Sequence, residues 1–166
     1  MDAVEKAIRQ RRSVRKYRPD MPDAEDVRRI LAAGTWAPSG LNNQPWKFML
    51  VKGKQHKDRL AEFTKYSKII KNAPLAICVF LDKGAAYNRE KDIMAVGACV
   101  QNILLFAHKL GYGTCWLGEI LNRKEQVQKF LKSDSDCELM AVITMGYPAE
   151  RASKGRRKTL KHFILK

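Results

Sequence analysis

One nearly continuous apolar run constrains the fold of this chain more than any other feature. It extends from Leu75 to Leu81 and contains no charged residue. A helix that spans a membrane needs about 20 apolar residues, and this run is much shorter. An apolar run of this length is typical of a strand that is covered on both faces. We therefore expect a central strand whose sheet is flanked by helices.

The flanking sequence predicts one domain over residues 1–166 with an α+β fold and a central mixed sheet. Expected helices cover residues 2–10, 23–33, 54–71, 88–110 and 122–131, and expected strands cover residues 46–51, 75–81, 114–117 and 138–145. Asp23 is expected to cap the second helix, and Asn122 with Glu125 forms a possible capping box before the last. Gly111 and Gly113 are expected to end the long helix.

The N-terminal residues and the cysteine and histidine content argue against a secreted, a membrane or a metal-binding protein. The first residues, Met1 to Glu5, carry two acids and no apolar signal core, which predicts a cytoplasmic protein with no membrane association. The four cysteines form no CxxC pair, and the three histidines are not near a cysteine. We therefore expect reduced thiols and no metal site.

The formal net charge of +15 predicts attraction to anions. Nucleic acid is one possible partner, and a phosphorylated cofactor with anionic dinucleotide substrates is another. The basic residues are spread over segments 9–18, 52–71, 123–132 and 151–161. Trp36, Trp46 and Trp116 lie in apolar sequence contexts, unlike a base-stacking platform. We expect no specific nucleic-acid partner.

The first candidate binding cluster contains Arg11, Arg12, Ser13 and Arg15, directly after the first expected helix. Guanidinium groups give bidentate hydrogen bonds to phosphate oxygens, and a serine hydroxyl adds a further donor. The alternative is a solvated basic turn. A second basic run, residues 154–158, could complete a phosphate site or form a solvated tail.

Two further segments could approach a flat ligand. Residues 38–46 are rich in Pro, Asn and Gln, and amide side chains can both donate to and accept from a heteroaromatic edge. Residues 111–119 contain three glycines, which allow close approach of the backbone, but match neither a Walker loop nor a dinucleotide fingerprint. Ordinary turns and a buried strand are the alternatives for both segments.

The residue set contains no convincing nucleophile. Cys115 has no histidine close in sequence, and Ser39 lacks the GxSxG context of a nucleophile elbow. A site rich in Arg, Asn and Gln instead suits a bound cofactor that carries the chemistry. We name no side chain as catalytic.

Three segments together resemble the nitroreductase family of flavoproteins. They read RRSVRKY (11–17), APSGLNNQPW (37–46) and QNILLFAHKLGYGTCWLGE (101–119), and the chain is similar to the compact members. The resemblance implies the α+β nitroreductase fold and an intertwined homodimer with two FMN sites at its interface. Gly40 stands where many members have a second serine, and Glu119 where glycine is common.

By the same resemblance, FMN is held by residues from four segments. The implied residues are Arg11, Arg12, Ser13 and Arg15 for the phosphate and ribityl chain; Pro38, Ser39, Asn42 and Gln44 in the loop, contributed by the partner subunit; Leu117, Gly118 and Glu119 near flavin N5; and Arg156 or Arg157 at the phosphate.

The implied activity is electron transfer from NADH or NADPH through FMN to a small acceptor such as a nitroaromatic, a quinone or a flavin, by a ping-pong mechanism. Three alternatives within the same fold are a dehalogenase, a flavin-destroying enzyme and a flavin carrier. A basic nucleic-acid-binding module is the alternative outside it.

Overall fold

A computed structural model of the chain describes residues 2–151 and 154–165. Its strands are β1 (Trp46–Val51), β2 (Leu75–Asp82), β3 (Gly113–Leu117) and β4 (Cys137–Gly146). Its α-helices are α1 (Ala3–Gln10), α2 (Ala24–Thr35), α3 (Lys54–Ala61), α4 (Ser67–Asn72), α5 (Arg89–Lys109) and α6 (Lys124–Leu131). Short 3-10 helices cover η1 (Gly40–Asn42), η2 (Glu119–Arg123) and η3 (Leu160–His162).

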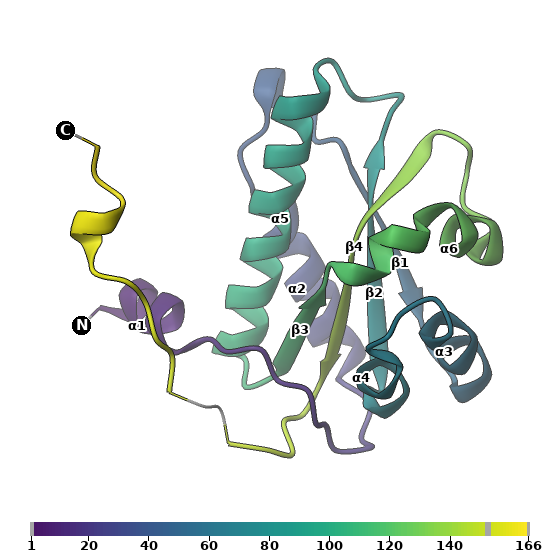
Figure 1. The fold of residues 1–166 in the computed structure, drawn as a ribbon, viewed down its shortest axis with the longest axis horizontal. Coiled ribbons are helices and arrows are strands. Elements are labelled where there is room, and N and C mark those ends of the chain that lie inside the picture. Colours follow the sequence, from purple (N-terminus) through teal and green to yellow (C-terminus); the bar gives the residue numbers. More distant parts are fainter. Residues whose placement is uncertain (1, 152–153, 166) are drawn as a thin grey trace.

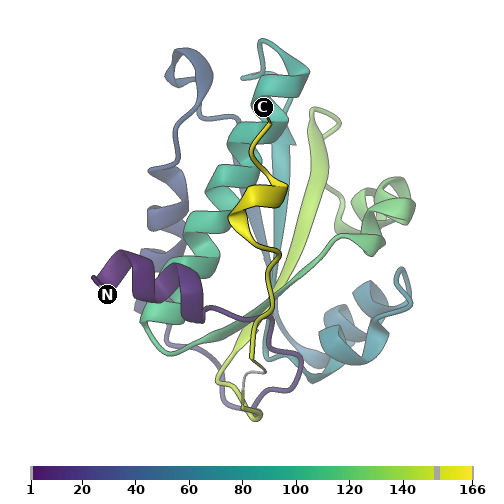
Figure 2. The same ribbon diagram turned by 60° about the vertical axis from the view of Figure 1, so that its left-hand side comes forward.

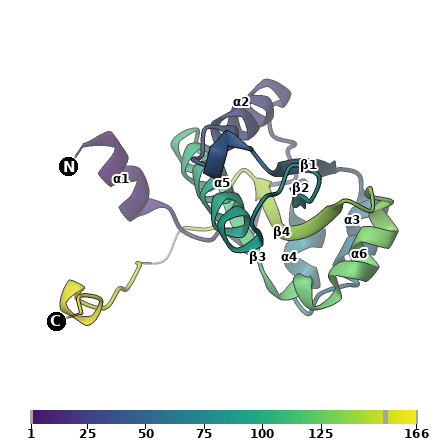
Figure 3. The same cartoon turned by 90° about the horizontal axis from the view of Figure 1, so that it is seen from above.

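The four strands form one sheet in the order β1-β2-β4-β3, with α2 and α5 on one face and α3, α4 and α6 on the other (Figures 1 and 3). All three strand pairs are antiparallel, whereas the sequence analysis expected a mixed sheet. Parallel pairing occurs only as the isolated bridge between Ser13 and Thr114, among the described residues. The prediction of a mixed sheet was therefore wrong, because neighbouring strands of the sheet run in opposite directions throughout.

The apolar run from Leu75 to Leu81 forms strand β2, which is covered on both faces. Ile77 and Val79 belong to the core beneath α2 and α5, and Cys78 and Phe80 belong to the core beneath α3, α4 and α6. Successive side chains of a strand point to opposite faces, so both faces must be apolar when both are covered. Full burial of each large apolar side chain stabilises the fold by about 1.5–3 kcal/mol.

Helix α2 begins as expected, because the Asp23 carboxylate accepts hydrogen bonds from the backbone N–H groups of Glu25 and Asp26. Helix α5 likewise begins at the cap Asn88, whose side chain accepts from the Lys91 backbone. The two helices pack against each other, and apolar residues of both belong to the core that includes Ile77 and Val79 of β2. The helix predicted over residues 88–110 is confirmed in type and nearly in length.

Three local predictions were wrong. The helix expected over residues 54–71 is divided into α3 and α4, because the Thr64 hydroxyl accepts from the Tyr66 backbone and turns the chain. The capping box at Asn122 and Glu125 does not form, since η2 runs directly into α6 with no side-chain cap. Gly113 begins β3 instead of ending α5.

The two ends of the chain extend from the body on the same side (Figures 1 and 2). The segment after β4 returns along the N-terminal segment, where Ala149 N–H donates to the Lys16 carbonyl at 2.9 Å. Beyond it, the tail exposes four large apolar side chains, Leu160, Phe163, Ile164 and Leu165. In the described ranges, no helix is both long enough and apolar enough to cross a membrane.

Candidate functional site

Arg11, Arg12 and Arg157 come together where α1 ends and the tail passes. Arg12 and Arg157 line a hollow of about 360 Å³ with Ile8, Arg9 and Gly155. Burial, and then the charges of Arg12 and Arg157, lower the pKa of Arg11 from its ordinary value. Gathering like charges is unfavourable unless an anion neutralises them, and guanidinium groups suit a phosphate. The sequence analysis expected a phosphate site here, and the structure brings three of its arginines together.

The rest of the N-terminal segment lies along β3. Ser13 forms a bridge with Thr114, and Val14 N–H donates to the Thr114 carbonyl at 2.9 Å. The Glu150 carboxylate accepts a hydrogen bond of 2.8 Å from the backbone N–H of Arg15. The Arg15 guanidinium takes no part in this hydrogen bond. These contacts place the basic segment beside the first residues of β3.

Arg156 and Arg157, the two tail candidates for the phosphate, have different surroundings. Arg157 lies in the basic hollow with Arg12, and its charge acts on Arg11. Arg156 contributes its carbonyl, which accepts from the Arg157 side chain at 2.7 Å. Of the two candidates, Arg157 is the one brought to the basic cluster.

The amide-rich loop lies at the other end of α5. Pro38, Ser39 and Gly40 line a hollow of about 250 Å³ with the α5 residues Lys91, Met94, Ala95 and Ala98. The Ser39 hydroxyl accepts from the Gln44 backbone at 3.0 Å, and the Gln44 side chain donates to the Asn42 carbonyl at 3.2 Å. Asn42 and Gln44 are both exposed, so their amides are accessible to a ligand.

Leu117, Gly118 and Glu119 follow one another at the end of β3. Leu117 is buried, whereas a Cβ placed on Gly118 would meet no atom within 4 Å. The Glu119 carboxylate accepts hydrogen bonds from the Thr64 hydroxyl and the Lys65 backbone. The Thr64 bond is the main cause that lowers the Glu119 pKa. The Glu119 side chain thus holds the α3–α4 connection, and the backbone at Gly118 is exposed.

The predicted phosphate residues and the predicted loop residues therefore form two separate groups. Asp92, near the start of α5, contacts the loop, and His108, near its end, is acted on by the charges of Arg11 and Arg12. Sixteen residues of helix at about 1.5 Å per residue place these positions roughly 24 Å apart. One chain does not bring its own loop to its own basic cluster.

Sequence reasoning missed several residues of these two groups. His108 lies near the arginines, and burial, followed by the charges of Arg11 and Arg12, lowers its pKa. Asn43 and Asp92 are joined by a hydrogen bond of 2.7 Å. Asn43 lies in the amide-rich loop but was not a predicted site residue, and Asp92 lies in none of the motifs, since a pairing 49 positions apart leaves no local signal. Burial raises the pKa of Cys115 despite the nearby Arg15 and Arg11, which argues against an activated thiolate there.

Two tryptophans are more exposed than their apolar sequence contexts suggested. Trp46 is buried, but Trp36 is 86% exposed and Trp116 is 43% exposed. Trp36 ends α2 beside the amide-rich loop, and Trp116 lies on the edge strand β3. Both lie next to predicted site segments, not among the basic residues.

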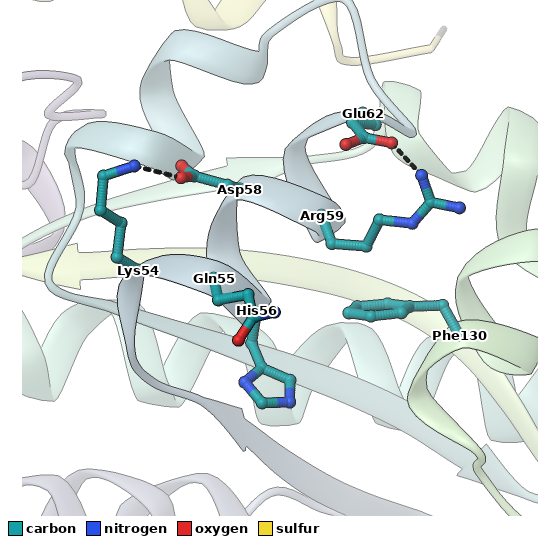
Figure 4. A pocket seen from close by; sticks show the side chains of 7 residues that line it. All are labelled: Lys54, Gln55, His56, Asp58, Arg59, Glu62 and Phe130. Carbon is teal, nitrogen blue, oxygen red and sulfur yellow. Dashed lines mark hydrogen bonds and ion pairs between the residues drawn. The ribbon is translucent and has the colours of Figure 1, made fainter.

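A larger cavity lies across the sheet from these groups. It measures about 660 Å³ and is lined by Lys54, Gln55, His56, Asp58, Arg59, Glu62 and Phe130 (Figure 4). Lys54 pairs with Asp58, and Arg59 pairs with Glu62. Because two of its cations pair with carboxylates that line the same cavity, this cavity is poorly suited to an anion.

Comparisons with known proteins relate this chain to one family. A profile of the nitroreductase family matches residues 8–66 and 62–147. A Methanothermobacter thermautotrophicus protein, provisionally named NADH dehydrogenase/NAD(P)H nitroreductase, is 34% identical over 90% of this chain and 79% of its own length. A Thermotoga neapolitana iodotyrosine deiodinase is 28% identical over 88% of this chain and 89% of its own.

The fold is also similar to solved structures. A nitroreductase-like protein from Desulfovibrio desulfuricans, crystallised in complex with FMN, aligns with a TM-score of 0.96. It is 44% identical and covers 100% of this chain and 97% of its own. The profile match extends over most of the sequence, from the basic segment to the end of β4. This chain belongs to the nitroreductase family.

Proposed function

We propose that this protein binds FMN and passes electrons from NADH or NADPH to a small acceptor. The convergence of Arg11, Arg12 and Arg157 is the observation that carries the proposal. Three of the five residues that line their hollow are arginines, and guanidinium groups bind a phosphate through bidentate, charge-assisted hydrogen bonds. When bound, FMN supplies the hydride chemistry, and the protein binds and orients it.

Each group of residues has a distinct role in this proposal. Arg11, Arg12, Arg15, Arg157 and Ser13 hold the phosphate and ribityl chain. The open backbone at Gly118 allows a flat ring to approach, because no side chain stands there. Pro38 and Ser39 shape the loop that presents Asn42 and Gln44 to the ring. Donor and acceptor occupy the same place in turn, which gives ping-pong kinetics.

The separation of the two groups along α5 supports a homodimer. A two-fold axis that pairs the α5 helices antiparallel would bring the loop of one subunit to the basic cluster of the other. The outer face of α5 is suited to this contact, since Met94 is exposed and a Cβ on Gly97 would meet no atom within 4 Å. The exposed apolar tail would pack on the partner.

The test is a comparison of FMN with riboflavin, which lacks the phosphate. The purified protein should be yellow or take up FMN when it is supplied, and it should bind riboflavin far more weakly. Anaerobic addition of NADH and NADPH in separate experiments should bleach the flavin absorbance. A protein that takes up neither flavin would refute the proposal.

The acceptor is tested on the reduced protein. The panel contains a nitroaromatic, a quinone, free FMN and iodotyrosine, the last because one relative is named for its deiodination. We expect the nitroaromatic or the quinone to reoxidise the protein fastest. Release of iodide at a comparable rate would instead support the dehalogenase alternative.

A further inference from the structure

Asp92 is a buried carboxylate that joins two segments far apart in the sequence. Its Oδ2 accepts hydrogen bonds from the backbone N–H groups of Tyr87 and Asn88, both at 2.9 Å. Its Oδ1 accepts from Asn43 Nδ2 at 2.7 Å. Burial raises the pKa of Asp92, but the bonds from Asn43, Asn88 and Tyr87 outweigh it and hold that pKa below its ordinary value. The carboxylate is therefore charged at neutral pH.

The backbone on both sides of Asn43 is strained. Leu41, Asn42 and Gln44 adopt positive φ angles of 55°, 54° and 48°. Residues other than glycine rarely adopt this left-handed conformation, which persists only where the surroundings impose it. Asn43 lies between Asn42 and Gln44, the two residues whose amides are proposed to meet the flavin. Its side chain also donates to the Ala85 carbonyl at 3.0 Å.

The same carboxylate also fixes a second contact with the loop. Tyr87, whose backbone donates to Asp92, packs so closely on Gly40 that a Cβ there would come within 1.8 Å of the Tyr87 hydroxyl. Gly40 thus accommodates the Tyr87 ring at the position where many family members have serine. Asp92 reaches the loop through Asn43 on one side and through Tyr87 on the other.

We propose that Asp92 is the positioning residue of the cofactor-binding loop, which it holds through Asn43 and Tyr87 in the strained backbone that FMN binding requires. This inference rests on the proposed function, because its consequence is FMN affinity. Asp92 would not touch the cofactor. An ionised carboxylate suits this role because it accepts three hydrogen bonds at once and gives each of them charge assistance.

The test uses Asn43→Ala, Asp92→Asn and the double variant, with two measurements. We expect each single variant to weaken FMN binding about tenfold, because each breaks the charge-assisted hydrogen bond between Asn43 and Asp92. The double variant should be little weaker than the worse single one, because both changes break the same connection. In protein without FMN, amide hydrogen exchange at residues 42–44 should be faster in both single variants.

The control is Asp26→Asn, which removes a carboxylate that accepts from the Tyr112 hydroxyl at 2.9 Å, away from the loop. It should lower the urea midpoint while FMN affinity and the visible circular dichroism of bound FMN stay unchanged. If Asp92→Asn does not fold, Asn43→Ala decides alone, because it leaves the two backbone bonds of Asp92 intact.

A folded Asn43→Ala protein with wild-type FMN affinity and wild-type amide exchange would overturn the inference. Wild-type protein that takes up no FMN would instead count against the proposed function. The exchange measurement, which needs no cofactor, would then still decide whether Asp92 and Asn43 hold the loop.

Discussion

Gly155 lies against Arg12, and a Cβ on residue 155 would come within 2.4 Å of the Arg12 guanidinium. This contact joins the tail of the chain to the segment after α1, at the hollow proposed for the phosphate. Tight packing on a guanidinium fixes the direction of its donors.

We expect Gly155→Ala to weaken FMN binding with little change in the free energy of unfolding. The added methyl group must displace the Arg12 side chain, whose charge-assisted bonds to a phosphate contribute about 1.5–3 kcal/mol. FMN titration and urea denaturation measure the two quantities. Gly84→Ala is the control, because its Cβ would come no closer than 3.3 Å to a neighbouring atom. Equal FMN affinity in both variants would contradict the expected role of the contact.

Arg11→Ala and Arg15→Ala should each weaken FMN binding by about one to two decades, since each removes bonds of roughly 1.5–3 kcal/mol to an anion. The fold should lose much less stability, because neither guanidinium is part of the core. Arg28→Ala, which removes an exposed pair with Glu25, is the matched control and should leave FMN binding unchanged. Titration of FMN into the three variants measures the difference. Unchanged affinity in both test variants would show that the cluster is a solvated basic turn.

A protein that ends at Thr159 should dimerise far more weakly than the full chain. The deletion removes Leu160, Phe163, Ile164 and Leu165, whose burial on a partner would contribute about 3 kcal/mol or more in total. Light scattering over a range of concentrations measures the dissociation constant. Lys161→Ala keeps the apolar residues and should dimerise normally. A full-length protein that is monomeric with FMN bound would refute the dimer.

Acid should destabilise the protein partly through Glu138. Hydrogen bonding to Arg89, followed by the contribution of Lys124, lowers the Glu138 pKa to about 2. A carboxyl whose pKa is lowered on folding stabilises the folded state above its ordinary pKa of 4.5, and this stabilisation is lost as pH falls toward 2. Glu138→Gln should therefore cost about 1 kcal/mol at pH 7 and flatten the stability curve between these values. Glu90→Gln, an exposed change, should leave the curve nearly as it is.

The net charge of +15 should appear as a dependence on salt. Rising ionic strength should slow the second-order reduction of the flavin by NAD(P)H, because it screens the attraction of an anionic donor. Weak nucleic-acid binding should fall steeply in the same series of buffers. Stopped-flow absorbance and fluorescence anisotropy make the two measurements. Sequence-dependent nucleic-acid binding that survives physiological salt would favour the nucleic-acid alternative.

The sequence alone determined those features that depend on local patterns. The apolar run predicted β2, the cap Asp23 predicted the start of α2, and the long segment before Gly111 predicted α5. Hydrogen bonding and periodicity act over a few residues, so their signals can be read locally. The basic segment at Arg11 and the amides at Asn42 and Gln44 were visible for the same reason.

The tertiary structure decided how these pieces combine. It divided the helix expected over 54–71 through a turn at Thr64, and it selected Arg157 over Arg156 at the basic cluster. It also revealed that Asp92 holds Asn43, which is 49 positions away. Such contacts depend on which segments meet after folding, and a pairing between distant residues of ordinary types leaves no pattern along the chain.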